Sequence, residues 1–234
     1  MMLVEKWELV ERFLPQLWEG TLVTLQLVGL AVLIGLIVAI PLGLGRASRH
    51  WYIRALPYGY IFFFRGTPLL LQLFLVYYGI SQFQAVRDSF LWPYLREPFW
   101  CALITMTMHT AAYIAEILRG AIQAVPPGEV EAARALGMSR RQALLHIILP
   151  RAIRIGLPAY GNEVILMLKA SAVVYTVTMM DIMGVIRTIN SRTYEYELFF
   201  VVAGVMYLII TLVFTQLFRL VERWLKVDAS RQSR

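Results

Sequence analysis

Long uncharged stretches alternate with short charged intervals along this chain. The first stretch, residues 21–44, carries no Asp, Glu, Lys or Arg over 24 residues. A helix of about 20 apolar residues crosses a hydrocarbon layer of roughly 30 Å, so this stretch is long enough to span a membrane. Four more apolar stretches follow, at residues 56–80, 99–118, 157–177 and 198–218. The pattern predicts an all-α membrane protein with five transmembrane helices and a membrane domain over residues 21–218.

The intervals between these stretches have their own predicted forms. Residues 1–20 are amphipathic, with Trp7, Phe13 and Trp18 as interfacial anchors, and we expect a short helix that ends near Pro15–Gly20. The other intervals are predicted to be a basic turn, two polar loops and a basic tail, at residues 45–54, 81–98, 181–197 and 219–234.

Composition supports the membrane class. The chain is 59% hydrophobic and 16% charged, whereas soluble domains are about one quarter charged. Its single cysteine, Cys101, excludes an internal disulfide and a cysteine metal cluster. Glu5, Glu8 and Glu11 occupy the region where a cleavable signal peptide would be basic, so we expect none.

The distribution of basic residues predicts the orientation. Fourteen of the 22 lysines and arginines fall in residues 45–54, 119–154 and 219–234, and six fall in the intervals on the other side. Because cytoplasmic loops are enriched in lysine and arginine, the N-terminus is expected outside and the C-terminal tail in the cytoplasm. The net charge of +7 therefore reflects topology rather than nucleic-acid binding.

The polar interval 128–150 is predicted to form two helices joined by a glycine elbow. Glu129–Leu136 reads as the first helix, and Gly137 follows at the position where a left-handed residue ends a helix. Ser139 begins the second helix with a capping box completed by Gln142. This second helix, residues 140–149, is expected to stop at Pro150.

The spacing of residues in this interval resembles the EAA loop of binding-protein-dependent ABC importer permeases. The matching residues are Glu131, Ala132, Ala133, Gly137, Ile147, Leu149 and Pro150. The resemblance implies a cytoplasmic coupling helix that docks on an ATP-hydrolysing subunit. The alternative is an amphipathic hairpin that lies on the membrane surface.

One acidic residue, Glu163, falls inside an apolar stretch, where charged residues are costly and often functional. On a helix it shares a face with Tyr160 and Met167, and Asn162 precedes it directly. A carboxylate in these surroundings is a candidate site for a guanidinium or ammonium group. The alternative is that Glu163 pairs with a basic residue such as Arg65 and only holds the bundle together.

A helix-breaking motif interrupts the second stretch at residues 65–68, Arg-Gly-Thr-Pro. Pro68 lacks an N–H group, so a kink or a break is predicted there. Broken helices at membrane depth commonly line substrate paths, which makes Arg65 and Thr67 candidate substrate contacts. The alternative is that Arg65 clamps the carbonyl groups that Pro68 leaves free.

Other polar residues have simpler interpretations. Glu116 and Arg119 are expected to form an ion pair one turn apart, and His109 to pack or to form a hydrogen bond between helices. The chain contains no phosphate-binding G-x-x-x-x-G-K-[ST] motif, no HExxH and no GxSxG. We therefore predict no catalytic or metal site, no cofactor and no enzymatic activity, and we expect ATP to bind to another polypeptide.

The resemblance extends over nearly the whole chain, through residues 62–79, 111–122, 129–139 and 160–184. These segments are similar to polar amino-acid importer permeases, in particular to the M-type subunits of the histidine/lysine/arginine/ornithine and octopine/nopaline systems. The implied fold is the type I ABC importer transmembrane domain, in a bacterial inner membrane. In that family, the acidic residue that corresponds to Glu163 is associated with cationic substrates.

The resemblance also implies partners and a function. The expected partners are a second homologous permease, an ABC ATPase dimer, a periplasmic substrate-binding protein and membrane lipid, without nucleic acid. The expected function is import of a cationic amino acid or an opine. A passive channel and a membrane-embedded enzyme are the rival classes: a channel would need no EAA loop, and the chain carries no constellation of catalytic residues.

Overall fold

The structure is a computed structural model that describes residues 3–225, and every regular element in that range is helical. In chain order the helices are α1 (Leu3–Arg46), α2 (Trp51–Gly66), α3 (Leu69–Phe74), α4 (Gln84–Arg87), α5 (Trp92–Leu95), α6 (Pro98–Gln123), α7 (Pro127–Ala135), α8 (Arg140–Ala143), α9 (Leu149–Ala170), α10 (Ile182–Thr193) and α11 (Tyr196–Trp224). Two π-helical segments (Leu75–Gly79 and Leu144–Ile148) and two 3₁₀ segments (Ile80–Gln82 and Ser171–Val177) extend or join them.

Three of these helices, α1, α6 and α11, are long and apolar enough to cross a membrane. Two bent pairs of helices also qualify if each pair is counted as one crossing. The first pair is α2 and the helical segment Leu69–Gln82, which begins with α3, and its bend is 105°. The second pair is the continuous helical rod Arg140–Val177 and α10, and its bend is 49°. The all-α membrane fold is therefore confirmed. Five crossings remain the prediction, because the number depends on how each bent pair is counted.

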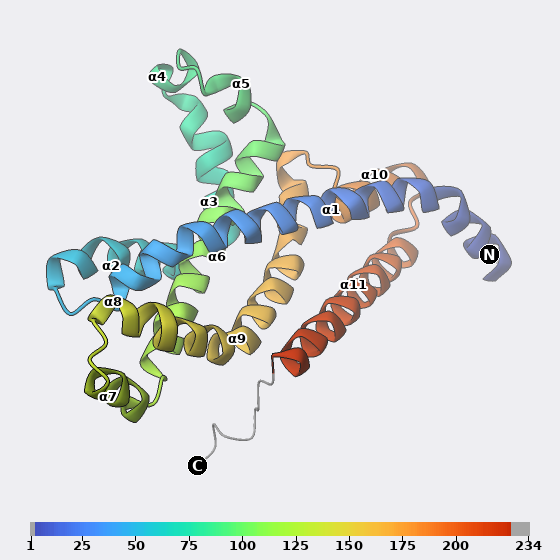
Figure 1. Cartoon of the computed structure of the whole chain (residues 1–234). Helices are drawn as coiled ribbons and strands as arrows, with labels where there is room; N and C mark the ends of the chain where they lie inside the picture. The colour runs from blue at the N-terminus through green and yellow to red at the C-terminus, as the bar shows by residue number, and fades with distance from the viewer. Residues whose placement is uncertain (1–2, 226–234) are drawn as a thin grey trace.

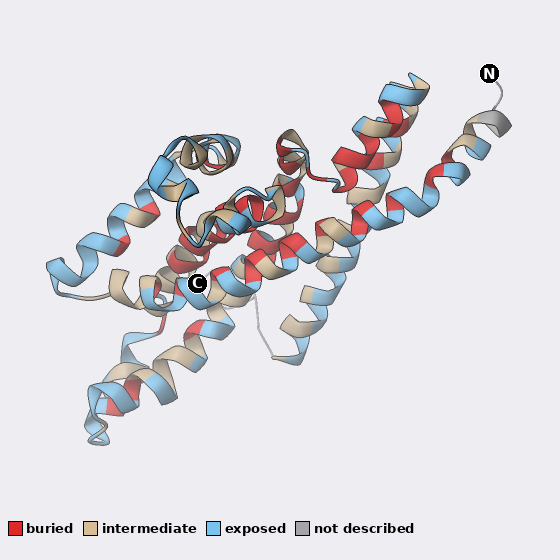
Figure 2. Ribbon diagram, turned by 90° about the horizontal axis from the view of Figure 1, so that it is seen from above, coloured by how far each residue is buried: buried red, intermediate tan, exposed pale blue. Residues whose placement is uncertain are grey.

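The long helix α1 lies across the others and organises the core (Figure 1). Its most extensive contact is with α6, and it also contacts α2, α9 and α10. Buried residues gather where these helices cross, while the outer faces are exposed (Figure 2). The main core cluster draws on α1, α3, α6, α9 and the segment that follows it: Leu27, Val28, Ala31, Val32, Leu73, Ala102, Leu103, Met106, Val164, Met167, Leu168, Val174, Val177 and Met179.

The prediction of a separate N-terminal helix that ends near Pro15–Gly20 is wrong, because α1 runs through this region without a break. Gly20 is the point at which α1 approaches the start of α10: a Cβ atom there would lie 2.9 Å from Val185 and 3.1 Å from the carbonyl oxygen of Asp181. Thr24, one turn later, accepts a hydrogen bond from the first backbone N–H of α10 (3.2 Å). Tertiary packing here outweighs the weak helix propensity of glycine.

The prediction of a polar loop over residues 181–197 is also wrong, because most of it forms α10. The Asp181 carboxylate caps this helix by accepting a hydrogen bond from the backbone N–H of Gly184 (3.0 Å). Apolar side chains at helical spacing then pack one face of α10 against α1 and α11; they are Ile182, Val185, Ile186 and Ile189, which meet Phe13, Leu17 and Phe199. This amphipathic spacing was the signal for a helix that the overall polarity of the segment concealed.

Pro150 does not end a helix, contrary to the prediction. The chain widens into a π-helical turn over Leu144–Ile148, in which the backbone N–H of Leu149 bonds to the carbonyl of Leu144, five residues back. Pro150 then follows as the second residue of α9 and donates no backbone hydrogen bond. The π turn thus absorbs the proline, and the rod continues into the membrane domain.

The connecting segments lie at different ends of the molecule. The short helices α4 and α5, which form part of the predicted loop 81–98, lie at one end, while α7 and α8 lie at another, near the start of α2 (Figure 1). The last helix, α11, continues to Trp224, six residues beyond the predicted end of the fifth apolar stretch at residue 218. Residues 1 and 2 of the predicted N-terminal segment and residues 226–234 of the predicted tail lie outside the described residues.

Candidate functional site

The glycine elbow at the end of α7 has the predicted geometry. Gly137 adopts a left-handed conformation with φ +76°. Its N–H donates to the carbonyl of Arg134 (2.9 Å), and the N–H of Met138 donates to the carbonyl of Ala133 (3.1 Å). These two hydrogen bonds form a Schellman motif, which satisfies the last carbonyl groups of α7 and fixes the direction in which the chain leaves it.

The predicted capping box at the start of α8 is confirmed as well. The Ser139 backbone N–H donates to Oε1 of Gln142 (2.9 Å), and the Gln142 backbone N–H donates to Oγ of Ser139 (3.3 Å). Only two residues separate this box from the C-cap of α7. The angle between α7 and α8 is therefore set by local hydrogen bonds at both ends of the elbow.

The underside of this elbow is anchored to the membrane domain. Ala133 is 3% exposed, and the neighbouring Val130 packs against a small cluster formed by the end of α6 and the start of α9. An ion pair between Arg151 of α9 and Glu129 of α7 (3.2 Å) adds a second link. These contacts join α7 directly to α9, the helix that carries Glu163.

The predicted coupling residues divide into an outer and an inner set. Glu131, Ala132, Gly137 and Pro150 are exposed, Ile147 and Leu149 are half-buried, and Ala133 is buried. A partner that docks on this loop can therefore reach the exposed residues, whereas Ala133 faces its own chain.

The basic turn between α1 and α2 lies beside the elbow. Ser48, Arg49 and His50 line a cavity of about 640 Å³ together with Arg134 of α7 and Arg140 of α8. Two segments that the charge pattern assigns to the same side of the membrane are thus neighbours, and together they form a positively charged surface.

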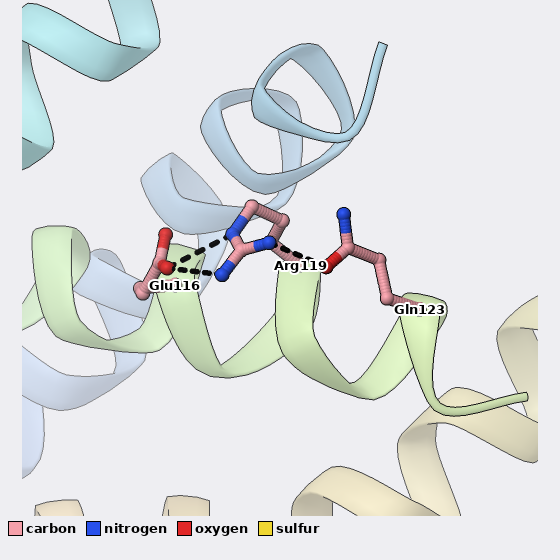
Figure 3. A network of polar contacts seen from close by, with 3 residues as sticks. All are labelled: Glu116, Arg119 and Gln123. Carbon is pink, nitrogen blue, oxygen red and sulfur yellow. Dashed lines mark hydrogen bonds and ion pairs between the residues drawn. The ribbon is translucent and has the colours of Figure 1, made fainter. Parts of the chain in front are cut away.

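A polar network marks the end of α6 that leads into the elbow (Figure 3). Nε of Arg119 donates to Oε1 of Glu116 (2.9 Å), and a second nitrogen of the guanidinium contacts the same oxygen. Arg119 also donates to the side-chain oxygen of Gln123. The predicted ion pair is confirmed, and it extends by one further turn to Gln123.

The intramembrane acid, Glu163, is buried in the middle of α9. It is 6% exposed, and Oε1 accepts a hydrogen bond of 3.3 Å from the Thr110 hydroxyl of α6. The three ion pairs among the described side chains, those of residues 6–225, involve other carboxylates, so Glu163 forms no ion pair with any of these residues. The alternative interpretation, a pair with a basic residue such as Arg65, is therefore not formed among them, and Thr110 is a partner that sequence reasoning missed.

The residues predicted to surround Glu163 occupy different environments. Tyr160 is half-buried and packs edge-to-face on Phe218 of α11, with ring centroids 6.0 Å apart. Met167 belongs to the main core, and Asn162 is exposed on another face of α9. Gly161 allows α11 to approach closely, because a Cβ atom there would lie 2.9 Å from the Phe218 ring. Glu163 is therefore held at a tight contact between helices.

The predicted break in the second apolar stretch is confirmed. α2 ends at Gly66, α3 begins at Leu69, and the two parts are bent by 105°. Arg65 does not bind the freed carbonyl groups; its guanidinium lies 5.2 Å from the centre of the Tyr113 ring, and the residue is exposed. The structural alternative for Arg65 is therefore wrong, and Arg65 is free to meet other partners.

The clamp at this break is Gln72, which sequence reasoning missed. Its Nε2 group donates to the carbonyls of Phe64 (2.9 Å) and Thr67 (3.1 Å) and to the Thr67 hydroxyl (2.7 Å). Its Oε1 lies 2.9 Å from Nδ1 of His109, which confirms the predicted hydrogen bond between helices. An amide one turn after a helix-breaking proline is the signal that could have identified it.

Comparison with known proteins extends these observations. Residues 23–227 match the family described as binding-protein-dependent transport system inner membrane component. The octopine transport system permease protein OccM of Rhizobium radiobacter is 45% identical over 88% of this chain and 84% of its own length. The histidine/lysine/arginine/ornithine transport system permease protein HisM of Escherichia coli K12 is 43% identical over 92% of this chain and 94% of its own length.

Two solved structures share the fold. One is described as an amino acid ABC transporter with histidines; it has a TM-score of 0.82 and 37% identity, over 92% of this chain and 96% of the matched chain. The other is an inward-facing MetNI methionine ABC transporter, with a TM-score of 0.75 and 18% identity over 92% of this chain and 98% of its own; it supports the fold alone.

The fold and the elbow together define a transport permease of the type I ABC importer class. This chain belongs to the family of binding-protein-dependent transport system inner membrane components. It is a multi-pass inner membrane protein, and its relatives are importer permeases, which supports the importer interpretation against the passive channel.

Proposed function

We propose that this permease carries a cationic amino acid, such as arginine, ornithine, lysine or histidine, or a related opine. The observation that carries the proposal is Glu163, a buried carboxylate with one hydrogen bond from Thr110 and no ion pair within residues 3–225. The names of its relatives, which include octopine, nopaline and histidine/lysine/arginine/ornithine systems, support the same class of cargo.

The chemistry of Glu163 explains why a cation suits this position. A buried carboxylate is costly inside a membrane unless a positive group pairs with it. A guanidinium or ammonium group that arrives in the path would supply that pair through charge-assisted hydrogen bonds. Thr110 already holds one oxygen in place, so the carboxylate is oriented before the ligand arrives.

The other proposed substrate contacts have secondary roles. Tyr160 offers an aromatic surface one turn before Glu163, and Met167 supports the carboxylate from the core one turn after it. Arg65 and Thr67 lie at the α2–α3 break, where irregular backbone can line a path. Asn162 is exposed and would meet either the ligand or the second permease.

We further propose that the elbow couples this path to ATP hydrolysis in a separate ABC ATPase dimer. Its exposed residues Glu131, Ala132 and Gly137 would dock on the ATPase, and the Glu129–Arg151 pair would transmit that movement to α9. This arrangement requires the elbow and the tail in the cytoplasm and the N-terminus in the periplasm, as the basic residues predict. A second permease and a periplasmic substrate-binding protein complete the proposed complex, in which ATP binds only to the ATPase subunits.

Substitution of Glu163 by glutamine tests the choice of cargo. Glu163→Gln keeps the shape and removes the charge, so uptake of L-arginine by the reconstituted complex should fall about 10- to 100-fold while complex yield is unchanged. Glu19→Gln, the same change at an exposed site in α1, should leave uptake unchanged. Full uptake by Glu163→Gln would remove Glu163 from the ligand site, and loss of the complex would make it a structural residue.

A further inference from the structure

A second polar cavity lies far from Glu163, between α10, the start of α11 and the 3₁₀ segment that follows α9. Its volume is about 570 Å³, a size that suits a small organic ligand. It is lined by Tyr175, Thr176, Met183, Arg187, Asn190, Ser191, Tyr196 and Phe200. None of these residues belongs to the coupling elbow or to the predicted substrate contacts.

The amide of Asn190 is the feature that points to a ligand. Asn190 is 2% exposed, and within residues 3–225 neither its side-chain nitrogen nor its side-chain oxygen has a hydrogen-bond partner. An unpaired buried amide costs free energy, and such groups are rare in folded proteins. Because Asn190 lines the cavity, a ligand there would supply both missing hydrogen bonds: an acceptor for Nδ2 and a donor for Oδ1.

The neighbouring groups define the chemistry of that ligand. Arg187 lies one turn before Asn190 on α10, is exposed and forms no ion pair within the described part of the chain; its guanidinium rests 6.0 Å from the centre of the Tyr175 ring. The hydroxyls of Thr176 and Ser191 already donate to backbone carbonyls (2.7 Å each), which leaves their oxygens free to accept. The cavity thus offers donors for a carboxylate and acceptors for an ammonium group.

We propose that this cavity binds the head group of an α-amino acid, its carboxylate at Arg187 and Asn190 Nδ2 and its ammonium group at Asn190 Oδ1. This inference rests on the proposed import function and adds a first binding position for the cargo. Tyr196 and Phe200, both about half exposed, form an aromatic wall over which the side chain of the cargo would lie.

The location of the cavity fits a position before Glu163 on the path. α10 lies at the opposite end of the molecule from α7 and α8, so it is outside if the coupling elbow is cytoplasmic (Figure 1). Tyr175 and Glu163 belong to one helical rod, and twelve residues of mixed α- and 3₁₀-helix separate them by about 20 Å. The head group would be held first, independently of side-chain charge, and Glu163 would then select the cation.

Two probes separate the head-group cavity from the Glu163 site. L-citrulline has an amino-acid head group and a neutral side chain, whereas agmatine has the guanidinium of arginine and no carboxylate. The purified importer complex in lipid nanodiscs, without the binding protein, should bind radiolabelled L-citrulline. Arg187→Gln and Asn190→Asp should each weaken this binding about 10- to 100-fold. Arg187→Gln removes a charge-assisted donor, and Asn190→Asp places a carboxylate beside the carboxylate of the ligand. Agmatine has no carboxylate to lose a partner, so its binding should not weaken in either variant.

A matched control completes the experiment. Arg192→Gln removes the same charge from an exposed residue of α10 that does not line the cavity, and it should leave L-citrulline binding unchanged. Because Arg187 is exposed, its variant keeps the test valid even if Asn190→Asp assembles poorly.

Several results would overturn the proposal: unchanged L-citrulline binding in both cavity variants, equal loss of agmatine binding, or a complex that never binds L-citrulline. If the variants lose only co-sedimentation with the binding protein, the cavity receives a side chain of that protein, and the proposal is wrong. Failure of the proposed import function would give a different result: the wild-type complex, supplied with its binding protein, would take up no L-arginine.

Discussion

Removal of the Gln72 amide is expected to destabilise the break between α2 and α3. Gln72→Leu keeps nearly the same volume, so no large cavity is created at this site, which is 3% exposed. The substitution instead removes the donor that satisfies the carbonyls of Phe64 and Thr67, and it deletes the contact with His109.

The expected cost follows from these lost partners. Leaving a buried carbonyl unpaired costs about 1–3 kcal/mol, and two carbonyls are involved. A hydrogen bond between membrane helices contributes about 0.6 kcal/mol on average, which is the expected share of His109. The Gln72 amide nitrogen serves three acceptors, the carbonyls of Phe64 and Thr67 and the Thr67 hydroxyl, so each of these hydrogen bonds is weaker than an unshared one. We therefore take the lower end of the range for each carbonyl, and the total cost is about 3 kcal/mol.

The effect is measured as the free energy of unfolding of the purified complex, titrated with denaturing detergent and followed by tryptophan fluorescence. Gln26→Leu, the same substitution at an exposed position of α1, should change this free energy by less than about 0.5 kcal/mol. Spin labels at Phe62→Cys and Leu71→Cys, two exposed positions on either side of the break, should report a broader distance distribution in the Gln72→Leu protein.

A double-mutant cycle with His109→Leu separates the two halves of the clamp. The coupling free energy between Gln72 and His109 should be about 0.6 kcal/mol, and the rest of the cost should persist in the His109→Leu background. A Gln72→Leu protein that loses less than about 1 kcal/mol and keeps a narrow distance distribution would refute the assignment of Gln72 as the clamp.

Two further predictions concern the elbow and the orientation. Gly137→Val should abolish uptake while leaving the protein in the membrane, because a β-branched residue at φ +76° costs about 1–2 kcal/mol or more. Gly137→Asn should retain most uptake, because asparagine tolerates this backbone conformation. The site has open space for either side chain, so the two variants differ only in how well they adopt that conformation. Normal uptake by the valine variant with a normal amount of bound ATPase would contradict this. Reporter fusions after Asp88 and after Ser191 should be periplasmic and those after His50 and Ser230 cytoplasmic; a cytoplasmic signal after Ser191 would remove one membrane crossing.

The sequence alone determined the features that depend on near neighbours. The length of the apolar stretches predicted an all-α membrane protein, because each stretch must satisfy its own backbone in lipid. The Schellman motif at Gly137 and the capping box at Ser139 were predictable since their hydrogen bonds join residues three to five positions apart. The break at Pro68 followed from the missing N–H of proline.

The tertiary structure decided the features whose partners lie far away in the chain. Gly20 and Pro150 look like helix ends in sequence, but close packing against α10 and a π turn carry the helices through them. The bonds from Gln72 to His109, from Glu163 to Thr110 and from Thr24 to the start of α10 join residues 37, 53 and 158 positions apart. No local pattern encodes these distances, so the clamp, the buried acid and the Asn190 cavity became visible only when the helices were packed together.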